Sequence, residues 1–342
     1  MRYGIKIIFY IFTLTTLASC SSLLPTRKPK LQTIAFYNVE NLYDTKANAR
    51  NMDFTPDGAM EWTEDRYKAK LSNIASVLAT IGGKDGPAVI GLSEVESKKV
   101  IEDLLKTSSL RSRGYQIIHH ESDDPLGLDI ALLYKAKVFK PTAHRAIKIQ
   151  FNESKFSSKD ILQVKGLLLG EPVTIYVNHW PSDGGSQRLG AQRRRAAATT
   201  LRKEIDAQFK VDPDATIILM GDFDEEPKSA ILEKVLRASG NPNPAIKGSF
   251  YNTFYLSYVN GLGSYMNRGD LQMLDQIMIS KSLLDQNNLE FVRGSSTIHK
   301  PEFIKYTFGK YKNTPRRTFA GTTYIGGYSD HFPVYIQVQK KK

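Results

Sequence analysis

One stretch of the chain joins a strand-like apolar run directly to two acidic residues: Ile217-Ile218-Leu219-Met220-Gly221-Asp222-Phe223-Asp224. An unbroken apolar run of this kind predicts a strand that is buried on both faces. Because the carboxylates follow it at once, such a strand would place them at the edge of its sheet. Taken alone, the segment is more typical of a strand followed by an ordinary acidic turn. The other strand ends of the chain decide between the two.

The charge of the chain favours an anionic partner. Its 342 residues include 47 Lys and Arg against 35 Asp and Glu, a formal net charge of +12. Such an excess favours a polyanion or an anionic surface and says nothing about the fold. The apolar content of 41% is ordinary for a globular protein, and the length allows one large α/β domain as well as two or three smaller ones.

The N-terminus has the pattern of a secretory signal. Arg2 and Lys6 precede an apolar run over residues 7–18, which is shorter than the ~20 residues that a membrane-spanning helix needs. The run ends in Leu17-Ala18-Ser19-Cys20, which resembles the signal of bacterial lipoproteins. The resemblance implies lipidation of Cys20, the only cysteine, and an extracytoplasmic protein anchored in the cell envelope, at the outer membrane. The alternative is a chance cysteine after an uncleaved signal.

After a signal peptide over residues 1–20 and a tether over 21–32, the pattern predicts a single domain over 33–342. We expect strands at 33–37, 87–92, 115–120, 128–134, 161–169, 172–178, 216–220, 274–280 and 332–338, and helices at 67–81, 98–106, 187–208 and 231–238. The Gly, Asn and other polar residues over 44–65 and 240–267 predict long surface loops. Short buried strands mixed with helices predict a layered α/β sandwich.

Ionisable and amide side chains stand at the ends of several of these strands: Asn38, Glu94, His179, Asp222, Asp224, Asp275, Asp330 and His331. Each one alone is more often a turn or capping residue than a catalytic one. Together they supply the oxygen ligands that a hard divalent cation prefers and the histidines that acid–base catalysis uses. The sequence therefore predicts a metal-dependent site where these strand ends meet.

Six motifs, in order, resemble those of the endonuclease/exonuclease/phosphatase superfamily, which includes deoxyribonuclease-like metal-dependent phosphoesterases. They are Asn38-Val39-Glu40-Asn41, Leu92-Ser93-Glu94-Val95, Asn178-His179-Trp180-Pro181-Ser182, Met220-Gly221-Asp222-Phe223-Asp224, Leu274-Asp275-Gln276-Ile277 and Ser329-Asp330-His331-Phe332-Pro333. The resemblance covers residues 33 to about 338. It implies a four-layer α/β sandwich of two packed, mainly antiparallel sheets with helices outside, and cleavage of phosphoric esters with Mg²⁺ or Mn²⁺.

The resemblance also implies roles for the motif residues. Glu94 would bind the metal, with Asn38 beside it and Asp330 as a further acidic ligand. Asp222 would orient or deprotonate the attacking water.

Two histidines would complete the site. His331 would contact the phosphate, and Asp275 would hold its ring by accepting from the other nitrogen. His179 suits phosphate binding or protonation of the leaving group. Asp129, at the start of its strand, is the expected partner of His179.

Asp224 departs from the family pattern, which usually has asparagine at this position. An amide can donate a hydrogen bond to the phosphate, whereas a carboxylate can only accept unless it is protonated. Either Asp224 binds a metal, or it is protonated because Asp222 lies two residues away, or the site is impaired. We expect an active enzyme with Asp224 close to metal or water.

Two basic stretches bear on the substrate. On the predicted helix after His179, Arg188 or Arg194 would reach a substrate phosphate, unless these arginines belong to a solvated face. Residues 300–317 interleave lysines with aromatic residues, a pattern that suits nucleic acid, an anionic membrane surface or a plain β-hairpin.

Three functions remain open from the sequence. The first is a monomeric, surface-anchored nuclease that acts on DNA or RNA. The second uses the same chemistry as a phosphatase or phosphodiesterase for phospholipid headgroups or inositol phosphates. The third is a non-catalytic, polyanion-binding lipoprotein in which Asp224 marks a decayed site.

Overall fold

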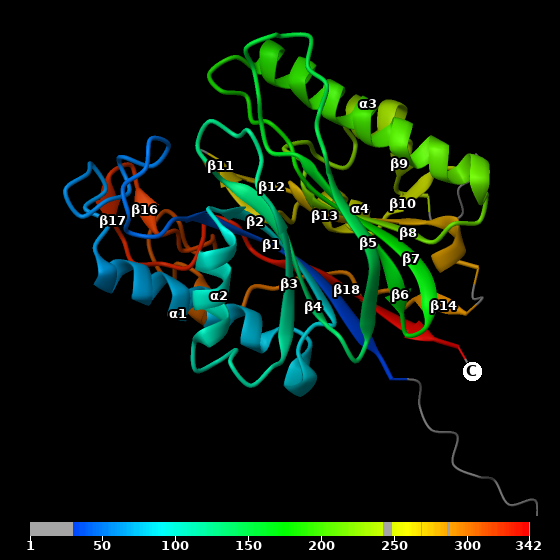
Figure 1. Cartoon of the computed structure of the whole chain (residues 1–342), viewed down its shortest axis with the longest axis horizontal. Coiled ribbons are helices and arrows are strands. Elements are labelled where there is room, and N and C mark those ends of the chain that lie inside the picture. Colours follow the sequence, from blue (N-terminus) through cyan, green and yellow to red (C-terminus); the bar gives the residue numbers. More distant parts are fainter. Residues whose placement is uncertain (1–29, 242–247, 268, 286–287, 342) are drawn as a thin grey trace, which may run out of the picture.

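Two seven-stranded sheets form the centre of the molecule (Figure 1). The computed structural model describes residues 30–241, 248–267, 269–285 and 288–341. The expected signal peptide, Cys20 and most of the expected tether lie outside these residues. Within the part that is described, no helix has the length and apolar character needed to cross a membrane.

The first sheet has the order β14-β18-β1-β2-β4-β3, with β15 paired to β18. Its strands are β1 (Gln32–Leu42), β2 (Val89–Val95), β3 (Tyr115–His120), β4 (Asp129–Lys135), β14 (Leu289–Phe291), β15 (Thr297–Ile298) and β18 (Val334–Lys340). The pair β1–β2 is parallel and the other pairs of this sheet are antiparallel.

The second sheet has the order β5-β6-β7-β8-β13-β10-β9. Its strands are β5 (Phe139–Ile147), β6 (Ile161–Leu168), β7 (Glu171–His179), β8 (Ile217–Asp222), β9 (Ala238–Ser239), β10 (Phe250–Asn252) and β13 (Asp275–Ser280). Two short hairpins stand apart from both sheets: β11 (Tyr265–Asn267) with β12 (Asp270–Gln272), and β16 (Phe319–Ala320) with β17 (Thr323–Tyr324).

Helices α1 (Glu64–Thr80), α2 (Lys98–Lys106) and α3 (Gln187–Val211) cover the outer faces of the two sheets (Figure 1), and further short helical segments lie in the connections. These segments are the short α4 (Tyr255–Val259), the π-helical turn η2 (Ile231–Leu236) and the 3₁₀ turns η1 (Gly83–Asp85), η3 (Lys281–Leu283) and η4 (Glu302–Ile304). Helices α1 and α2 pack on the first sheet, and α3 packs on the second. The expected four-layer α/β sandwich, with mainly antiparallel sheets, is confirmed.

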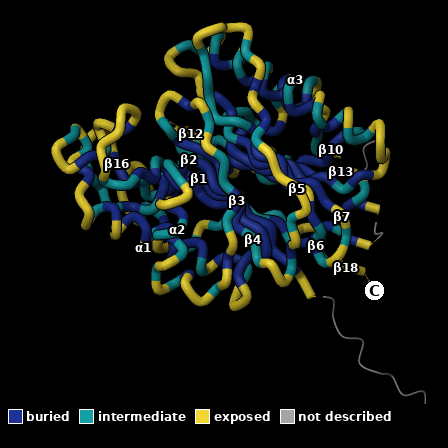
Figure 2. The backbone as a smooth tube through the Cα atoms, in the orientation of Figure 1, coloured by how far each residue is buried: buried dark blue, intermediate teal, exposed yellow. Residues whose placement is uncertain are grey.

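The inner faces of the two sheets share one apolar core, drawn dark blue in Figure 2. The contact is close enough to restrict side-chain size. A Cβ atom at Gly91 of β2 would lie 2.7 Å from Sδ of Met220 on β8 and 3.0 Å from Cγ1 of Val177 on β7. Because interiors pack at crystal-like density, a larger residue at Gly91 would force the sheets apart. This packing brings the ends of β1 and β2 next to those of β7 and β8.

Strand β5 was not predicted, and its composition explains why. It lies at the edge of the second sheet, and most of its central residues are exposed. An edge strand of this kind carries polar and charged residues such as His144 and Arg145 in place of an apolar run. Strand β1 is also longer than predicted, because it continues through an irregularity as far as Leu42.

A buried ion pair fixes the segment that leads to the last strand. Glu40, on β1, is 7% exposed and Lys70, on α1, is 1% exposed, with 3.6 Å between Nζ and Oε2. Glu40 Oε2 accepts from the backbone N–H of Thr318 at 2.6 Å. Lys70 Nζ donates to the hydroxyl of Thr318 and, at 3.0 Å, to the carbonyl of Tyr328. The pair therefore holds both ends of the segment that precedes Asp330.

We expect Lys70→Met to lower the free energy of unfolding by about 3–5 kcal/mol, because it leaves the Glu40 carboxylate buried and unpaired. Lys68→Met is the matched control on the same helix, since the Lys68 side chain is 66% exposed and, among the described residues, forms an ion pair only with Glu64. The control should change stability by less than about 0.5 kcal/mol. Urea unfolding measures both, and the double variant Glu40→Gln/Lys70→Met should recover part of the loss. Equal effects of Lys70→Met and Lys68→Met would contradict this assignment.

Candidate active site

The predicted site residues meet at one edge of the sandwich. In the second sheet, Asp222 is the register partner of His179 on β7 and of Asp275 on β13. Asn38 and Glu94 come from β1 and β2 of the first sheet, and Asp330 and His331 precede β18. These strand ends surround a hollow of about 370 Å³ whose lining includes Glu94, His179, Asp222, Asp224, Asp330 and His331. Asn38 and Asp275 are fully buried.

Irregular backbone aims Glu94 into the hollow. The register of β2 with β4 shifts between Ser93 and Val95, and Glu94 has φ of 63°. Positive φ is uncommon for residues other than glycine, and such bulges redirect side chains. The register of β1 with β2 also shifts, between Asn38 and Leu42. In this irregular segment the N–H of Asn41 donates to Glu94 Oε2 at 2.8 Å. No local pattern of residues predicts this bend.

Asn38 links the two sheets through their carboxylates. Its side-chain nitrogen donates to Glu94 Oε1 and to Asp222 Oδ2, both at 3.0 Å. Its side-chain oxygen accepts from the backbone N–H of Glu40 at 3.0 Å. Because both contacts of the amide nitrogen are made in the interior, they fix the separation of the two acidic groups.

Glycine at position 221 permits the approach of β8 to β7. A Cβ atom there would lie 2.4 Å from the carbonyl oxygen of Asn178. This glycine, in the stretch that joins the apolar run to Asp222, is therefore required by the close contact of the two strands.

His331 forms the predicted pair with Asp275. Its Nδ1 lies 2.7 Å from Asp275 Oδ2, and its Nε2 lies 3.7 Å from Asp222 Oδ2. Burial lowers the pKa of His331, but Asp275 and Asp222 outweigh burial and hold the pKa well above its usual value. The Tyr265 ring stacks on the imidazole, with 4.6 Å between centroids. His331 is therefore a positively charged donor in the site.

His179 has the opposite electrostatic environment. Its Nε2 lies 3.7 Å from Glu94 Oε1 and 3.8 Å from Asp222 Oδ2. Burial, followed by Lys159 and His331, lowers its pKa well below the usual value. His179 is therefore neutral. Two imidazoles with pKa values moved in opposite directions are typical of a site that needs one charged and one neutral group.

Asp129 is not the partner of His179, and that prediction was wrong. Asp129 Oδ2 lies 3.3 Å from Nε2 of His119, and its Oδ1 accepts from the backbone N–H of Ser122 at 2.9 Å. Asp129 begins β4, and β3 pairs beside it, so its nearest histidine belongs to β3. The Nδ1 of His179 is buried and has no hydrogen-bond partner among the described residues.

Two carboxyl groups of the site, Asp222 and Asp330, have raised pKa values. Burial raises the pKa of Asp222, although His331 opposes the shift. Burial, followed by the charge of Glu40, raises the pKa of Asp330 to about 7. Several acidic groups crowded into a buried edge are stabilised when a cation or a proton neutralises them.

These residues fit a divalent metal ion. Glu94, Asp222 and Asp330 line the hollow and offer the oxygen atoms that Mg²⁺ and Mn²⁺ prefer. Among the described residues, one group of three, Asp222, Asp275 and His331, has candidate ligand atoms within 4.8 Å of one another. Because Asp275 and His331 already bond to each other at 2.7 Å, we regard this trio as the acid–base part of the site.

Asp224 lies beside Asp222 in a strained backbone conformation, with φ of 47°. Its N–H donates to Asp222 Oδ1 at 3.1 Å, and its Oδ2 is buried with no hydrogen-bond partner in the part of the chain that the structure describes. Burial, and then the charge of Asp222, raises the pKa of Asp224 to about 7. At neutral pH the Asp224 carboxyl is therefore divided between its protonated and its charged form.

Neither predicted arginine lines the hollow. Arg194 is 6% exposed, and its Nε donates to Glu225 at 2.7 Å while its Nη1 donates to Asp183 at 2.9 Å. Nη1 also lies 3.6 Å from Asp224 Oδ2. Arg194 therefore neutralises nearby carboxylates. Arg188 is exposed on the first turn of α3 and is not among the residues that line the hollow.

Sequence reasoning missed three residues of the site. Tyr265 falls in a segment predicted only as surface loop, and it reaches His331 through an isolated β-bridge. Lys159 lines the hollow. Arg317 belongs to the basic stretch, and its Nη2 lies 3.9 Å from Asp330 Oδ2. The rest of that stretch forms η4 and a short antiparallel turn with a bridge between Lys305 and Pro315, which among the open alternatives is nearest to a small hairpin.

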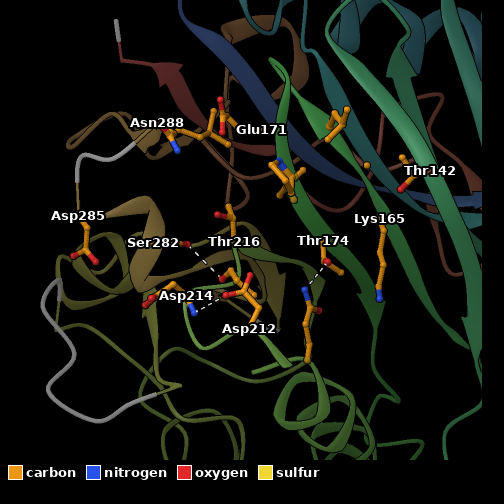
Figure 3. Close-up of a pocket in the computed structure, with 17 residues that line it drawn as sticks. Thr142, Lys165, Glu171, Thr174, Asp212, Asp214, Thr216, Ser282, Asp285 and Asn288 are labelled. Carbon is orange, nitrogen blue, oxygen red and sulfur yellow. Dashed lines mark hydrogen bonds between the residues drawn. The ribbon is translucent and has the colours of Figure 1, made fainter. Parts of the chain in front are cut away.

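A second hollow, of about 600 Å³, lies at the opposite ends of β7 and β8 (Figure 3). Glu171, Thr174 and Thr216 line it, and Glu171 pairs with Lys340 at 2.6 Å. None of the predicted site residues belongs to its lining.

The sequence matches the model of the Endonuclease/Exonuclease/phosphatase family over residues 33–340. The chain belongs to this family. A search of curated proteins finds no match.

Solved structures show the same fold. The chain is 15% identical to an endonuclease/exonuclease/phosphatase family protein from Bacteroides thetaiotaomicron, with a TM-score of 0.55 over 92% of this chain and 99% of that one. It is 14% identical to D. rerio TDP2 complexed with single strand DNA product, with a TM-score of 0.55 over 91% and 99%. It is also 14% identical to the human Nocturnin catalytic domain with bound sulfate, with a TM-score of 0.53 over 91% and 95%. At these identities the likeness establishes the fold alone.

We expect Asp275→Asn to lower the pKa of His331, because the substitution removes a charge that raises it. NMR titration of the imidazole in the metal-free protein measures the change. In the unaltered protein, protonated His331 stabilises the fold fully below its ordinary pKa of 6.5, and this contribution is lost as the pH rises through the folded-state value. An unchanged pKa in Asp275→Asn would contradict the pairing. Asp214→Asn, at the second hollow, is the control.

Proposed function

We propose that this family member is a divalent-metal-dependent nuclease, held outside the cytoplasm by lipidated Cys20 at the outer membrane. The observation that carries the proposal is the bridge from Asn38 to Glu94 and Asp222, beside the His331–Asp275 pair. This arrangement supplies oxygen ligands, a base and a charged donor around one hollow. The proposal agrees with a family of phosphoesterases and with the net charge of +12.

Glu94 and Asp330 would hold Mg²⁺ or Mn²⁺, with Asn38 beside them to orient Glu94, and the ion would neutralise a non-bridging phosphate oxygen and the leaving oxygen. Asp222 takes a proton from the attacking water, and its raised pKa makes it a better base near neutral pH. His331 donates from Nε2 to the phosphate while Asp275 holds Nδ1. His179, which is neutral, donates a single N–H without adding charge.

The fold relative that is complexed with a single-strand DNA product favours a nucleic-acid substrate over a lipid headgroup. The excess of positive charge agrees with either anionic substrate. A phosphatase or phosphodiesterase for phospholipids or inositol phosphates would use the same residues. A non-catalytic polyanion-binding protein would use the same positive charge to bind its ligand but would not hydrolyse it. A substrate panel separates these three functions.

We expect single-stranded DNA, RNA or both to be cleaved with Mg²⁺ or Mn²⁺ and to be left intact with EDTA. Asp222→Asn should lower kcat by a factor of about 10²–10⁴, because it removes the base. Asp214→Asn, the same change at the second hollow, should keep full activity. Hydrolysis of phospholipids or inositol phosphates alone would assign the phosphatase function. Binding of polyanions without turnover under any divalent metal would contradict catalysis.

We expect Asp224→Asn to keep its activity above pH 7, where the unaltered enzyme loses activity. The pKa of Asp224 is about 7, so its proton is present below that pH and is lost above it. Asparagine donates a hydrogen bond at every pH. Profiles of kcat/KM between about pH 6 and 9 measure the difference. An Asp224→Asn enzyme that is inactive at every pH would show that the carboxylate itself is needed.

The proposed lipid anchor at Cys20 is tested separately from the proposed nuclease activity. Growth with a labelled fatty acid should label the full chain, and Cys20→Ala should remove the label. Retention of the label in Cys20→Ala would contradict the proposed anchor.

A further inference from the structure

The cations of helix α3 fall into two groups. Arg193, Arg194 and Arg202 are held by carboxylates of Glu153, Glu225 and Asp206. Arg188, Arg195, Lys203 and, in the last turn, Lys210 are exposed, and none of them forms an ion pair within the described part of the chain. The first group stabilises the fold, and the second is free to meet an anion.

Arg188, Arg195 and Lys203, three of the free cations, share one face of the helix. They are seven and eight residues apart, so at 3.6 residues per turn they form a line that drifts through about 80° of arc around the helix. Gln192 and Thr199 lie between them on the same line and add hydrogen-bonding groups. At about 1.5 Å per residue, the line is roughly 22 Å long.

The line borders a groove of about 910 Å³ between α3 and residues 148–153. Arg195 and Lys203 line it with the polar side chains Gln150, Asn152 and Gln192. Its two acidic residues are already paired, Glu153 with Arg193 and Glu204 with Arg145. The groove is therefore positive and rich in hydrogen-bonding groups.

Arg193 connects this groove to the active site. It lines both the groove and the catalytic hollow. Its guanidinium lies 3.7 Å from the ring centroid of Phe156, which makes an edge contact with Phe151. A cation over an aromatic ring is a platform on which a base can stack without sequence preference.

We propose that this groove binds the strand of a nucleic-acid substrate that continues beyond the cleaved phosphodiester, so that the enzyme prefers long strands to short ones. The inference rests on the proposed nuclease function. A membrane surface fits less well, because Val211 is the one large apolar residue of α3 that is strongly exposed among the described residues. The recessed polar groove suits a flexible polyanion.

The test compares a strand of about 20 nucleotides with a dinucleotide at several salt concentrations. In Arg195→Glu/Lys203→Glu, the ratio of kcat/KM for the strand to that for the dinucleotide should fall at least tenfold. The slope of log(kcat/KM) against log salt should become shallower by about 1.4, the value for two lost contacts to single strands. Lys84→Glu/Lys137→Glu makes the same change of charge at exposed sites away from the groove and should leave the ratio unaltered.

Equal losses in the two double variants would overturn the proposal, because overall charge would then explain them. A ratio near one in the unaltered enzyme would also overturn it and leave the nuclease function standing. If neither substrate were cleaved with any divalent metal, the nuclease function itself would fail. Binding to anionic vesicles that is lost in Arg195→Glu/Lys203→Glu, with an unchanged strand preference, would assign the groove to a membrane and overturn the proposal.

Discussion

The two hydrogen bonds of the Asn38 amide are the interaction on which the site depends. They join Glu94 on one sheet to Asp222 on the other, each at 3.0 Å. The bonds exist because the sheets pack face to face so closely that β2 carries a glycine, Gly91, against Met220. The separation of the acidic groups is thus set by the core of the protein. A site built on packed strands in this way is held more rigidly than one built on loops.

The electrostatics of the site follow from burying many ionisable groups together. Asp275 and Asp222 keep His331 charged, whereas the burial of His179 keeps it neutral. Asp222, Asp224 and Asp330 all have raised pKa values because burial disfavours their charge. The positive charge of Arg194 lowers the pKa of Asp224 and so opposes the effect of burial. This charge helps the site to accommodate an aspartate at a position where the family usually has an amide. A phosphoesterase needs such groups poised between protonation states.

The sandwich and most of the site could be predicted from the sequence because both depend on local patterns of residues. Apolar runs that end in polar residues mark strand ends, and adjacent strand ends such as those of Asn38 and Asp222 meet at one edge. Side-chain pairs that depend on which strands or loops lie next to each other in space could not be predicted from local patterns. Asp129 pairs with His119 because β3 lies beside β4, and Tyr265 reaches His331 from a distant loop. Strand β5 carries no apolar run, because it lies at a sheet edge.

Titration with Mn²⁺, followed by its EPR signal, tests most directly whether this edge of the sandwich is a metal-dependent phosphoesterase site. The unaltered protein should bind Mn²⁺ in competition with Mg²⁺, since Glu94 offers a carboxylate to the hollow. Glu94→Gln should weaken that binding at least about tenfold while the protein stays folded. Equal Mn²⁺ affinity in the two proteins, or no binding in either, would contradict the account.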